Sequence, residues 1–235
     1  PLPKRAHPHW LGRESLGLLA GVTRDTRSSA TQNAKGRIMT SLLSLTLVTV
    51  LGATPATLTT SLFDHAASIH SPDEGVALTK AQTTANQKAF KKLDPLIDLN
   101  AFASAIMKPH TKHFTRKQLK QLTSDFAQTV RLIGFPRAGT FRDKATIEIA
   151  DTLKAKDRTS VTVFAEIPSE ELEVELVFHW SNQTPTRVFD VSIDGSSLIK
   201  DYQNQFGRII KKSGAKALLT KINNRLQSLR QKYGT

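Results

Sequence analysis

The spacing of apolar residues along the chain changes its period twice. Between residues 72 and 133, apolar positions recur every three or four residues, which is typical of amphipathic helices. From residue 145 to residue 193 they recur every second residue, which is typical of strands, and after residue 197 the helical period returns. This order of helices, strands and helices predicts an α+β fold in a single domain.

Three helices are expected before the strands. The first should cover residues 72–92, because residues 71–74 form a capping box and Asp94-Pro95 ends the pattern. A short helix should follow over residues 96–107. A second capping box, Thr115 with Gln118, opens the clearest helix, and Gly134-Phe135-Pro136 is expected to end it. The apolar face of that helix consists of Leu119, Leu122, Phe126, Val130 and Ile133.

The alternating segments predict four strands, over residues 145–151, 159–167, 171–180 and 186–193. In the third strand every second residue is large and apolar, and the residues between them include three glutamates. The apolar set is Leu172, Val174, Leu176, Phe178 and Trp180. We therefore expect a curved, mainly antiparallel four-stranded sheet with one solvated face and helices packed on the other.

Two further amphipathic helices, over residues 197–212 and 215–233, are expected to meet at Gly214.

The N-terminal part has the character of a targeting segment. Residues 1–37 form a polar, basic extension, and residues 38–63 carry no charge. We interpret residues 38–56 as a signal peptide, with Thr54 three residues before a cut after Ala56; a cut after Ala53 is the other candidate. An uncleaved anchor and a buried helix are the alternatives for this run. Residues 57–235 then form the folded domain.

Charge is distributed unevenly. The chain has 33 Lys and Arg against 20 Asp and Glu, a net charge of +13. The residues before 39 carry +5, those from 39 to 199 are balanced, and those from Lys200 onward carry +8. The basic C-terminal helices are thus a predicted surface for anionic lipid or acidic partners. They lack the interleaved aromatic residues of a nucleic-acid platform, so no nucleic-acid partner is expected.

The sequence offers little conventional active-site chemistry. The absence of cysteine excludes disulfides, thiolate metal sites and a cysteine nucleophile. His110 and His113 lack a nearby third ligand, so we interpret them as surface histidines rather than a metal pair. No catalytic or metal-binding residue is assigned.

The corner between the last strand and the following helix carries the most specific pattern. Gly195 permits the chain reversal, and Ser196 or Ser197 can cap the helix. Asp190 and Tyr202 are interpreted as structural hydrogen-bonding residues at this corner.

This segment resembles the MlaC (toluene-tolerance auxiliary) family of periplasmic phospholipid-binding proteins. The family segment reads V-Y-D-V-x-x-x-G-V-S-L-V-x-N-Y-R-x-Q-F, followed by I-L-x-x-x-G-x-x-x-L-I-x-x-L. The matching residues are Val188, Phe189, Asp190, Val191, Gly195, Ser197, Leu198, Ile199, Tyr202, Gln205, Phe206, Ile209, Ile210, Gly214, Leu218, Leu219 and Ile222. The helix over residues 114–133 is also similar to a family helix, whereas residues 106–110 depart from the family pattern L-G-x-x-W.

The resemblance implies an NTF2-like α+β domain that holds phospholipid tails between sheet and helices. It implies a periplasmic carrier, without enzymatic activity or a cofactor, that maintains outer-membrane lipid asymmetry. Its partners would be an inner-membrane ABC transporter complex and an outer-membrane lipoprotein–porin complex. The alternative is an NTF2-like small-molecule-binding domain or enzyme, which would need an acid or a histidine inside the pocket.

Candidate pocket residues come from the apolar faces of the predicted elements. Periodicity does not distinguish a pocket wall from packed core, and both interpretations stay open for each residue. The candidates are Phe102, Ile106, Leu122, Phe126, Val130, Val163, Val174, Leu176, Phe178, Val191, Leu198, Tyr202 and Phe206.

Overall fold

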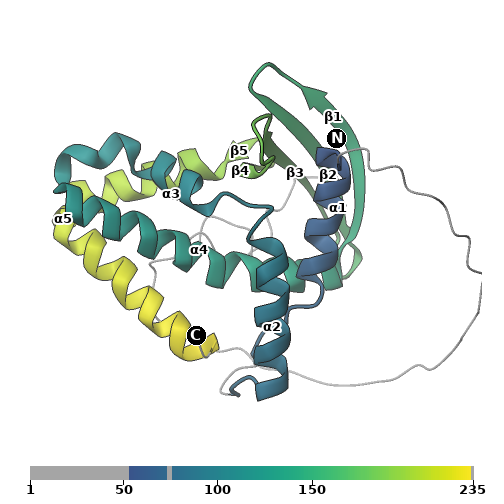
Figure 1. The fold of residues 1–235 in the computed structure, drawn as a ribbon, viewed down its shortest axis with the longest axis horizontal. Helices are drawn as coiled ribbons and strands as arrows, with labels where there is room; N and C mark the ends of the chain where they lie inside the picture. The colour runs from purple at the N-terminus through teal and green to yellow at the C-terminus, as the bar shows by residue number, and fades with distance from the viewer. Residues whose placement is uncertain (1–52, 73–75, 234–235) are drawn as a thin grey trace, which may run out of the picture.

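The computed structural model describes residues 53–72 and 76–233, which form a curved sheet at one end of a layer of helices (Figure 1). The α-helices are α1 (Pro55–Ala66), α2 (Lys80–Leu93), α3 (Leu99–Met107), α4 (Arg116–Lys144) and α5 (Leu198–Tyr233). Two 3₁₀-helices, Lys108–His113 and Pro168–Glu170, join neighbouring elements. The α+β fold class is confirmed.

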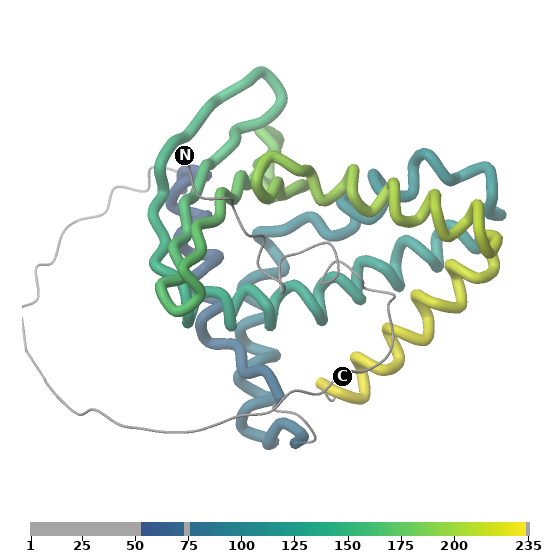
Figure 2. The backbone as a smooth tube through the Cα atoms, turned by 180° about the vertical axis from the view of Figure 1, so that it is seen from behind, coloured from purple at the N-terminus to yellow at the C-terminus, as the bar shows by residue number. Residues whose placement is uncertain are grey.

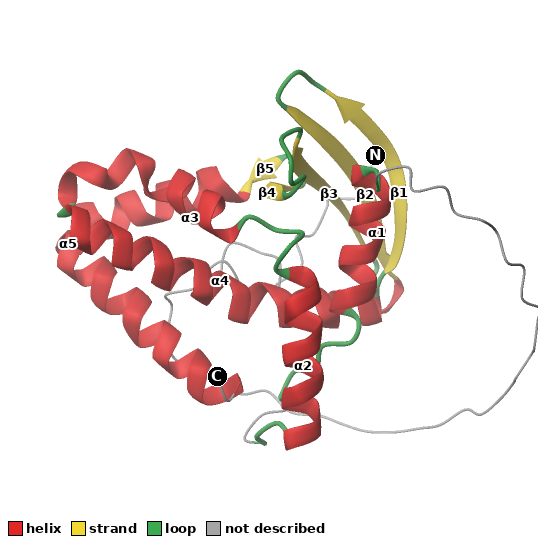
Figure 3. Cartoon of the chain, viewed as in Figure 1, coloured by secondary structure: helices red, strands yellow, loops and turns green. Residues whose placement is uncertain are grey.

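The sheet follows the chain order, and each strand pairs antiparallel with the next (Figure 3). Its strands are β1 (Thr146–Lys154), β2 (Arg158–Ile167), β3 (Leu172–Ser181), β4 (Val188–Ile193) and β5 (Ser196–Ser197). Four of these were predicted. The fifth was missed because a two-residue strand has no periodicity of its own.

The predicted faces of the sheet are confirmed. Phe178 on β3 pairs with Val161 on one side and Val191 on the other, so the three side chains share the inner face. The residues of β3 alternate between buried and more exposed along the whole strand. On the outer face, Phe164 pairs with Glu148 and Glu175 and is 50% exposed.

Helix α1 is an element that the sequence pattern did not separate from the uncharged run before it. The Thr54 side chain accepts a hydrogen bond from the backbone N–H of Thr57, and Pro55 occupies the first turn. Leu62 and Phe63 are buried in the core. Most of the predicted signal peptide, residues 38–52, lies outside the described residues, and its last four residues, 53–56, lead into α1.

The start of α2 was predicted wrongly. Residues 76–79 are not helical, and the helix begins at Lys80 behind a capping box formed by Thr79 and Gln82. The predicted box at residues 71–74 falls partly outside the described residues. Two competing capping signals lie eight residues apart, and the tertiary structure uses the second.

Helix α4 continues through Pro136, where the sequence predicted its end. An interior proline costs a helix about 3 kcal/mol or more. Packing offsets this cost, because Phe135 and Phe141 on either side of the proline are buried. Gly139 lets the helix lie against α1: a Cβ there would be 2.6 Å from the carbonyl oxygen of Ala66.

The break at Gly214 is confirmed. Its φ of 80° and ψ of 164° interrupt α5, and the two halves lie at an angle to each other, as the backbone trace shows (Figure 2). The second half returns beside α4, where Leu218, Ile222 and Leu226 are buried.

We predict that Thr59→Val destabilises the fold by about 1–3 kcal/mol. The fully buried Trp180 donates its indole N–H to the Thr59 hydroxyl at 3.0 Å, and valine would leave this donor unsatisfied. The measurement is the free energy of unfolding in urea. In the Trp180→Phe background the same substitution should cost clearly less; an equal cost in both backgrounds would contradict this account.

Candidate functional site

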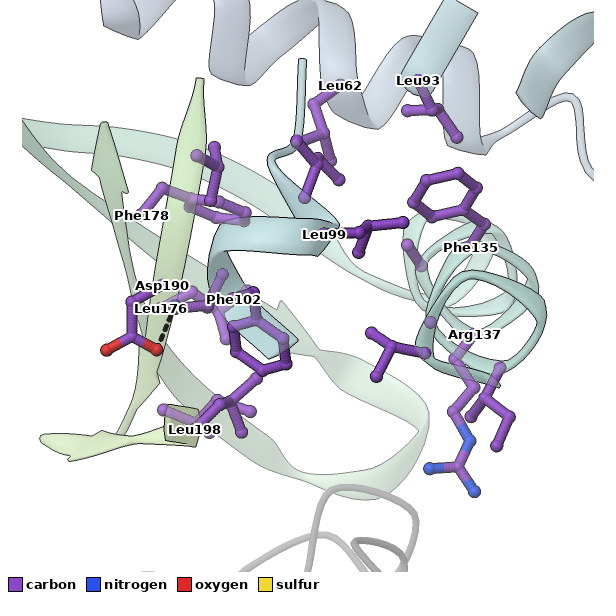
Figure 4. A pocket seen from close by; sticks show the side chains of 18 of the residues that line it. Leu62, Leu93, Leu99, Phe102, Phe135, Arg137, Leu176, Phe178, Asp190 and Leu198 are labelled. Atoms are coloured by element: carbon purple, nitrogen blue, oxygen red, sulfur yellow. Dashed lines mark hydrogen bonds between the residues drawn. The ribbon is translucent and has the colours of Figure 1, made fainter. Parts of the chain in front are cut away.

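An apolar cavity of about 250 Å³ lies between the inner face of the sheet and the helices (Figure 4). This volume is near the lower end of ligand pockets, which span ~300–1,000 Å³. Helices α1 to α4 supply Leu62, Phe63, Leu93, Leu99, Phe102, Val130, Ile133, Gly134, Phe135, Arg137, Ala138 and Phe141, and Ile97 lies just before α3. The sheet and α5 supply Leu176, Phe178, Val188, Phe189, Asp190, Val191, Ile193, Leu198 and Tyr202.

The cavity lies beside β4, where the helices leave part of the inner face of the strand uncovered. Val191 and Ile193 have inner-face register yet are only half-buried. Across from them, Gly134 contributes no side chain, and a Cβ built on it would meet nothing within 4 Å. Open space therefore remains beside α4 where a larger residue would be expected to pack.

The corner at Asp190 fixes the wall formed by α5. The Asp190 carboxylate accepts hydrogen bonds from the Ser197 hydroxyl at 2.6 Å and from the backbone N–H of Ile199 at 3.2 Å. It also accepts one from the backbone N–H of Val191 at 2.9 Å. The carboxylate therefore caps the first turn of α5 from the neighbouring strand, which orients Leu198 toward the cavity.

Tyr202 stands between the cavity and the helical core. Its ring contacts Phe102, Phe126 and Phe206, with centroid distances of 6.2, 5.2 and 6.0 Å. Burial raises the pKa of the Tyr202 phenol, so the side chain stays neutral. The structure thus gives Tyr202 an aromatic packing role, and the hydrogen-bonding role expected from the sequence stays a prediction.

Among the residues that the structure describes, Arg137 is the one cationic side chain in the cavity lining. It extends from α4 at the opposite side from Asp190 (Figure 4). Burial lowers the pKa of its guanidinium, and the neighbouring Arg225 acts in the same direction. The cavity therefore has an almost wholly apolar wall with one positive charge beside it.

Seven of the residues predicted from the sequence line this cavity, and six do not. Those at the cavity are Phe102, Val130, Leu176, Phe178, Val191, Leu198 and Tyr202. Those elsewhere in the core are Ile106, Leu122, Phe126, Val163, Val174 and Phe206. Phe126 and Phe206 pack edge-to-face at 5.0 Å between α4 and α5, and this close contact leaves no space there. Lipid contact by any of the thirteen stays a prediction.

Several lining residues were missed because α4 was ended too early. The helical spacing of Val130 continues through Gly134 and Ala138 to Phe141, and all of them line the cavity. That period was visible in the sequence, but the proline at 136 outweighed it. Leu62 and Phe63 were missed because α1 was not separated from the uncharged run.

The histidines within the described part of the chain do not line the cavity. His110 is buried, and its Nε2 is 2.9 Å from the Gln203 carbonyl oxygen, so its interpretation as a surface residue was wrong. On the outer sheet face, His179 lies between the hydroxyls of Ser160 and Ser192, and burial lowers its pKa. No group of three potential metal ligands occurs within residues 53–72 and 76–233.

The sequence was compared with models of known protein families, and one family model matches most of the chain. Residues 72–224 match the family model described as MlaC protein. The chain belongs to the MlaC family. The match covers α2 to most of α5, including the Asp190 corner and all of the sheet, so the sequence resemblance to MlaC is confirmed over most of the chain.

A solved structure shares this MlaC fold. It is the phospholipid-binding protein from Ralstonia solanacearum in complex with a phospholipid, with a TM-score of 0.55 and 19% sequence identity. The match covers 75% of this chain and 99% of that chain. No curated protein matches the sequence significantly.

We predict that Gly134→Leu lowers lipid occupancy without destabilising the fold. A leucine side chain would displace about three methylenes of a bound chain, which is ~2 kcal/mol or ~30-fold in affinity. Gly134→Ala should leave most of the cavity open and stabilise α4 by about 0.5–1 kcal/mol. The measurements are bound lipid per protein, by quantitative mass spectrometry, and thermal unfolding.

The control for this series is Ser124→Leu, which adds the same side chain to an exposed position on α4. Equal lipid occupancy in Gly134→Leu and Ser124→Leu would show that lipid does not use this cavity.

Proposed function

We propose that this MlaC-family protein binds a phospholipid with its acyl portion in the cavity, and carries it between membranes. The apolar cavity over β3 and β4 is the observation that supports the proposal most directly. Family membership and the shared fold with a protein solved in complex with a phospholipid support it further.

The energetics fit a carrier. Burying an acyl chain gains roughly 0.8 kcal/mol per methylene, so about ten methylenes provide ~8 kcal/mol, equivalent to micromolar affinity. Since the cavity is small, the glycerol and headgroup would remain near its opening. The hydrophobic effect alone then suffices for reversible loading, and no covalent step is required.

Binding is favoured over catalysis because the acid in the lining is already engaged. Asp190 accepts three hydrogen bonds as a helix cap, which leaves it poorly placed to act as a general base. His179 lies on the opposite face of the sheet. An NTF2-like enzyme would need such a group inside the cavity, so the carrier is the stronger proposal.

We further propose the periplasm as the location, with an inner-membrane ABC lipid transporter complex and an outer-membrane lipoprotein–porin complex as partners. In the described residues no helix combines the length and apolar character needed to cross a membrane. The charge is segregated: α5 has nine basic residues and one acidic, whereas residues 146–193 have four basic and nine acidic. Such polarity supports oriented docking on charged partners.

We predict that protein produced in an exporting bacterial host co-purifies with phospholipid. Denaturing extraction followed by mass spectrometry should give near-stoichiometric lipid, and native mass spectrometry should show the matching mass difference. A clean extract from correctly folded, exported protein would contradict the proposal.

We also predict that an exported precursor is cut after Ala53 rather than after Ala56. The first cut leaves the Thr54 cap and Pro55 on α1, whereas the second removes both. Loss of such a cap costs about 1 kcal/mol. The intact mass of the exported protein identifies the first residue, and a mature chain beginning at Thr57 would contradict this prediction.

A further inference from the structure

The cavity has one electrostatically distinct side. Its lining is apolar apart from Asp190, whose carboxylate caps α5, the phenol of Tyr202, and Arg137. Arg137 projects from α4 on the side away from the β4 corner, as Figure 4 shows. A ligand with apolar tails and a charged end would therefore meet its only cationic wall residue here.

A second arginine reaches the same place from another helix. Arg225 lies on the second half of α5, which returns beside α4 after the break at Gly214 (Figure 2). Its charge acts on Arg137, and so do the phenols of Tyr202 and Tyr233. Two segments almost ninety positions apart in sequence thus bring two guanidinium groups close enough for their charges to interact, and one of them, Arg137, lines the cavity.

The Arg225 side chain has an unfilled hydrogen-bonding position. Its Nε is buried and has no hydrogen-bond partner among the residues that the structure describes. Buried donors in folded proteins are nearly always paired, so an orphan donor calls for an explanation, and a bound anion would provide one. Two neighbouring guanidinium groups repel each other when partly desolvated, and an anion between them removes that cost.

Other basic clefts fit an anion less well. Two other clefts, one between α2 and the end of α5 and one between α4 and α5, share Arg131. Its guanidinium is already bound by both carboxylate oxygens of Asp94, at 2.6 and 2.8 Å, and lies over the Phe90 ring. Neither cleft shares a lining residue with the large apolar cavity.

We propose that Arg137 and Arg225 bind the phosphate of the lipid headgroup, while the tails occupy the adjoining cavity. This inference rests on the proposed function and adds to it the two residues that recognise the phosphate and so favour phospholipids over neutral lipids. Guanidinium groups suit this role because their planar donors match phosphate oxygens in pairs. The arginine pair would thereby set both the specificity and the orientation of the bound lipid.

The test compares two lipids with identical acyl chains, phosphatidylglycerol and diacylglycerol, loaded from vesicles onto delipidated protein. The unmodified protein should take up phosphatidylglycerol about tenfold more strongly. In the double variant Arg137→Gln/Arg225→Gln this preference should disappear, because phosphatidylglycerol binding falls while diacylglycerol binding stays the same. Thermal unfolding checks that each protein is folded.

The matched control is Arg116→Gln/Arg208→Gln, which removes the same two charges from exposed positions on the same two helices. This variant lowers the net charge by the same amount as Arg137→Gln/Arg225→Gln. It should nevertheless keep the full preference for phosphatidylglycerol, because Arg137 and Arg225 are unchanged. Arg137→Lys/Arg225→Lys keeps the charge but loses the paired donors, and should keep only part of the preference. It also provides the test if the glutamine variant does not fold.

Inorganic phosphate separates a headgroup site from a site for free phosphate. Phosphate that stabilises the delipidated protein, together with equal uptake of the two lipids, would overturn the headgroup proposal. Equal loss of preference in the control would overturn it as well, because the effect would then be general electrostatics. If neither lipid binds, the proposed carrier function itself fails, which is a distinguishable result.

Discussion

Covering the apolar inner face of the sheet is the constraint on which the rest of the structure depends. β2 and β3 present an unbroken apolar surface that ends in the fully buried Trp180, and such a face must be removed from water. Helices α1, α3 and α5 contact the sheet directly, and α4 crosses between them. The inner-face residues of β2 and β3 are buried, whereas Val191 and Ile193 on β4 stay half-buried beside the cavity. The cavity borders the part of that surface that the helices leave uncovered.

The same arrangement explains why the corner at Asp190 matters far beyond its own hydrogen bonds. By capping α5 from β4, one carboxylate fixes where that helix leaves the sheet, and hence where Leu198 and Tyr202 lie. The break at Gly214 then returns the helix to α4 and brings Arg225 toward Arg137. The corner at Asp190 positions the apolar residues of α5 at the cavity, and Gly214 brings the basic second half of the helix back beside α4. Arg225, one of the basic residues that give the chain its net charge of +13, is thereby placed near Arg137.

Much of the fold was predictable because periodicity directly reflects burial. The alternation in β3 predicted its inner face correctly, and Gly214 was correctly placed between two helices. The errors share one cause: local signals were read without their tertiary context. Pro136 looked like a helix end, yet Phe135, Phe141 and the close approach at Gly139 stabilise the helix through it. Because the predicted helix ended there, the cavity-lining residues beyond 134, including Arg137, were missing from the predicted site.

By itself, the sequence determined which residues leave water, because hydrophobic patterning is local and leaves a regular trace along each element. It also determined the family, through the segment around Asp190. Only the tertiary structure decided which buried residues border empty space and which are packed. Phe126 and Phe102 have equivalent patterns, but Phe126 packs closely against Phe206 while Phe102 borders the cavity. That difference depends on how far apart two helices lie, and the distance is set by contacts between segments remote in sequence.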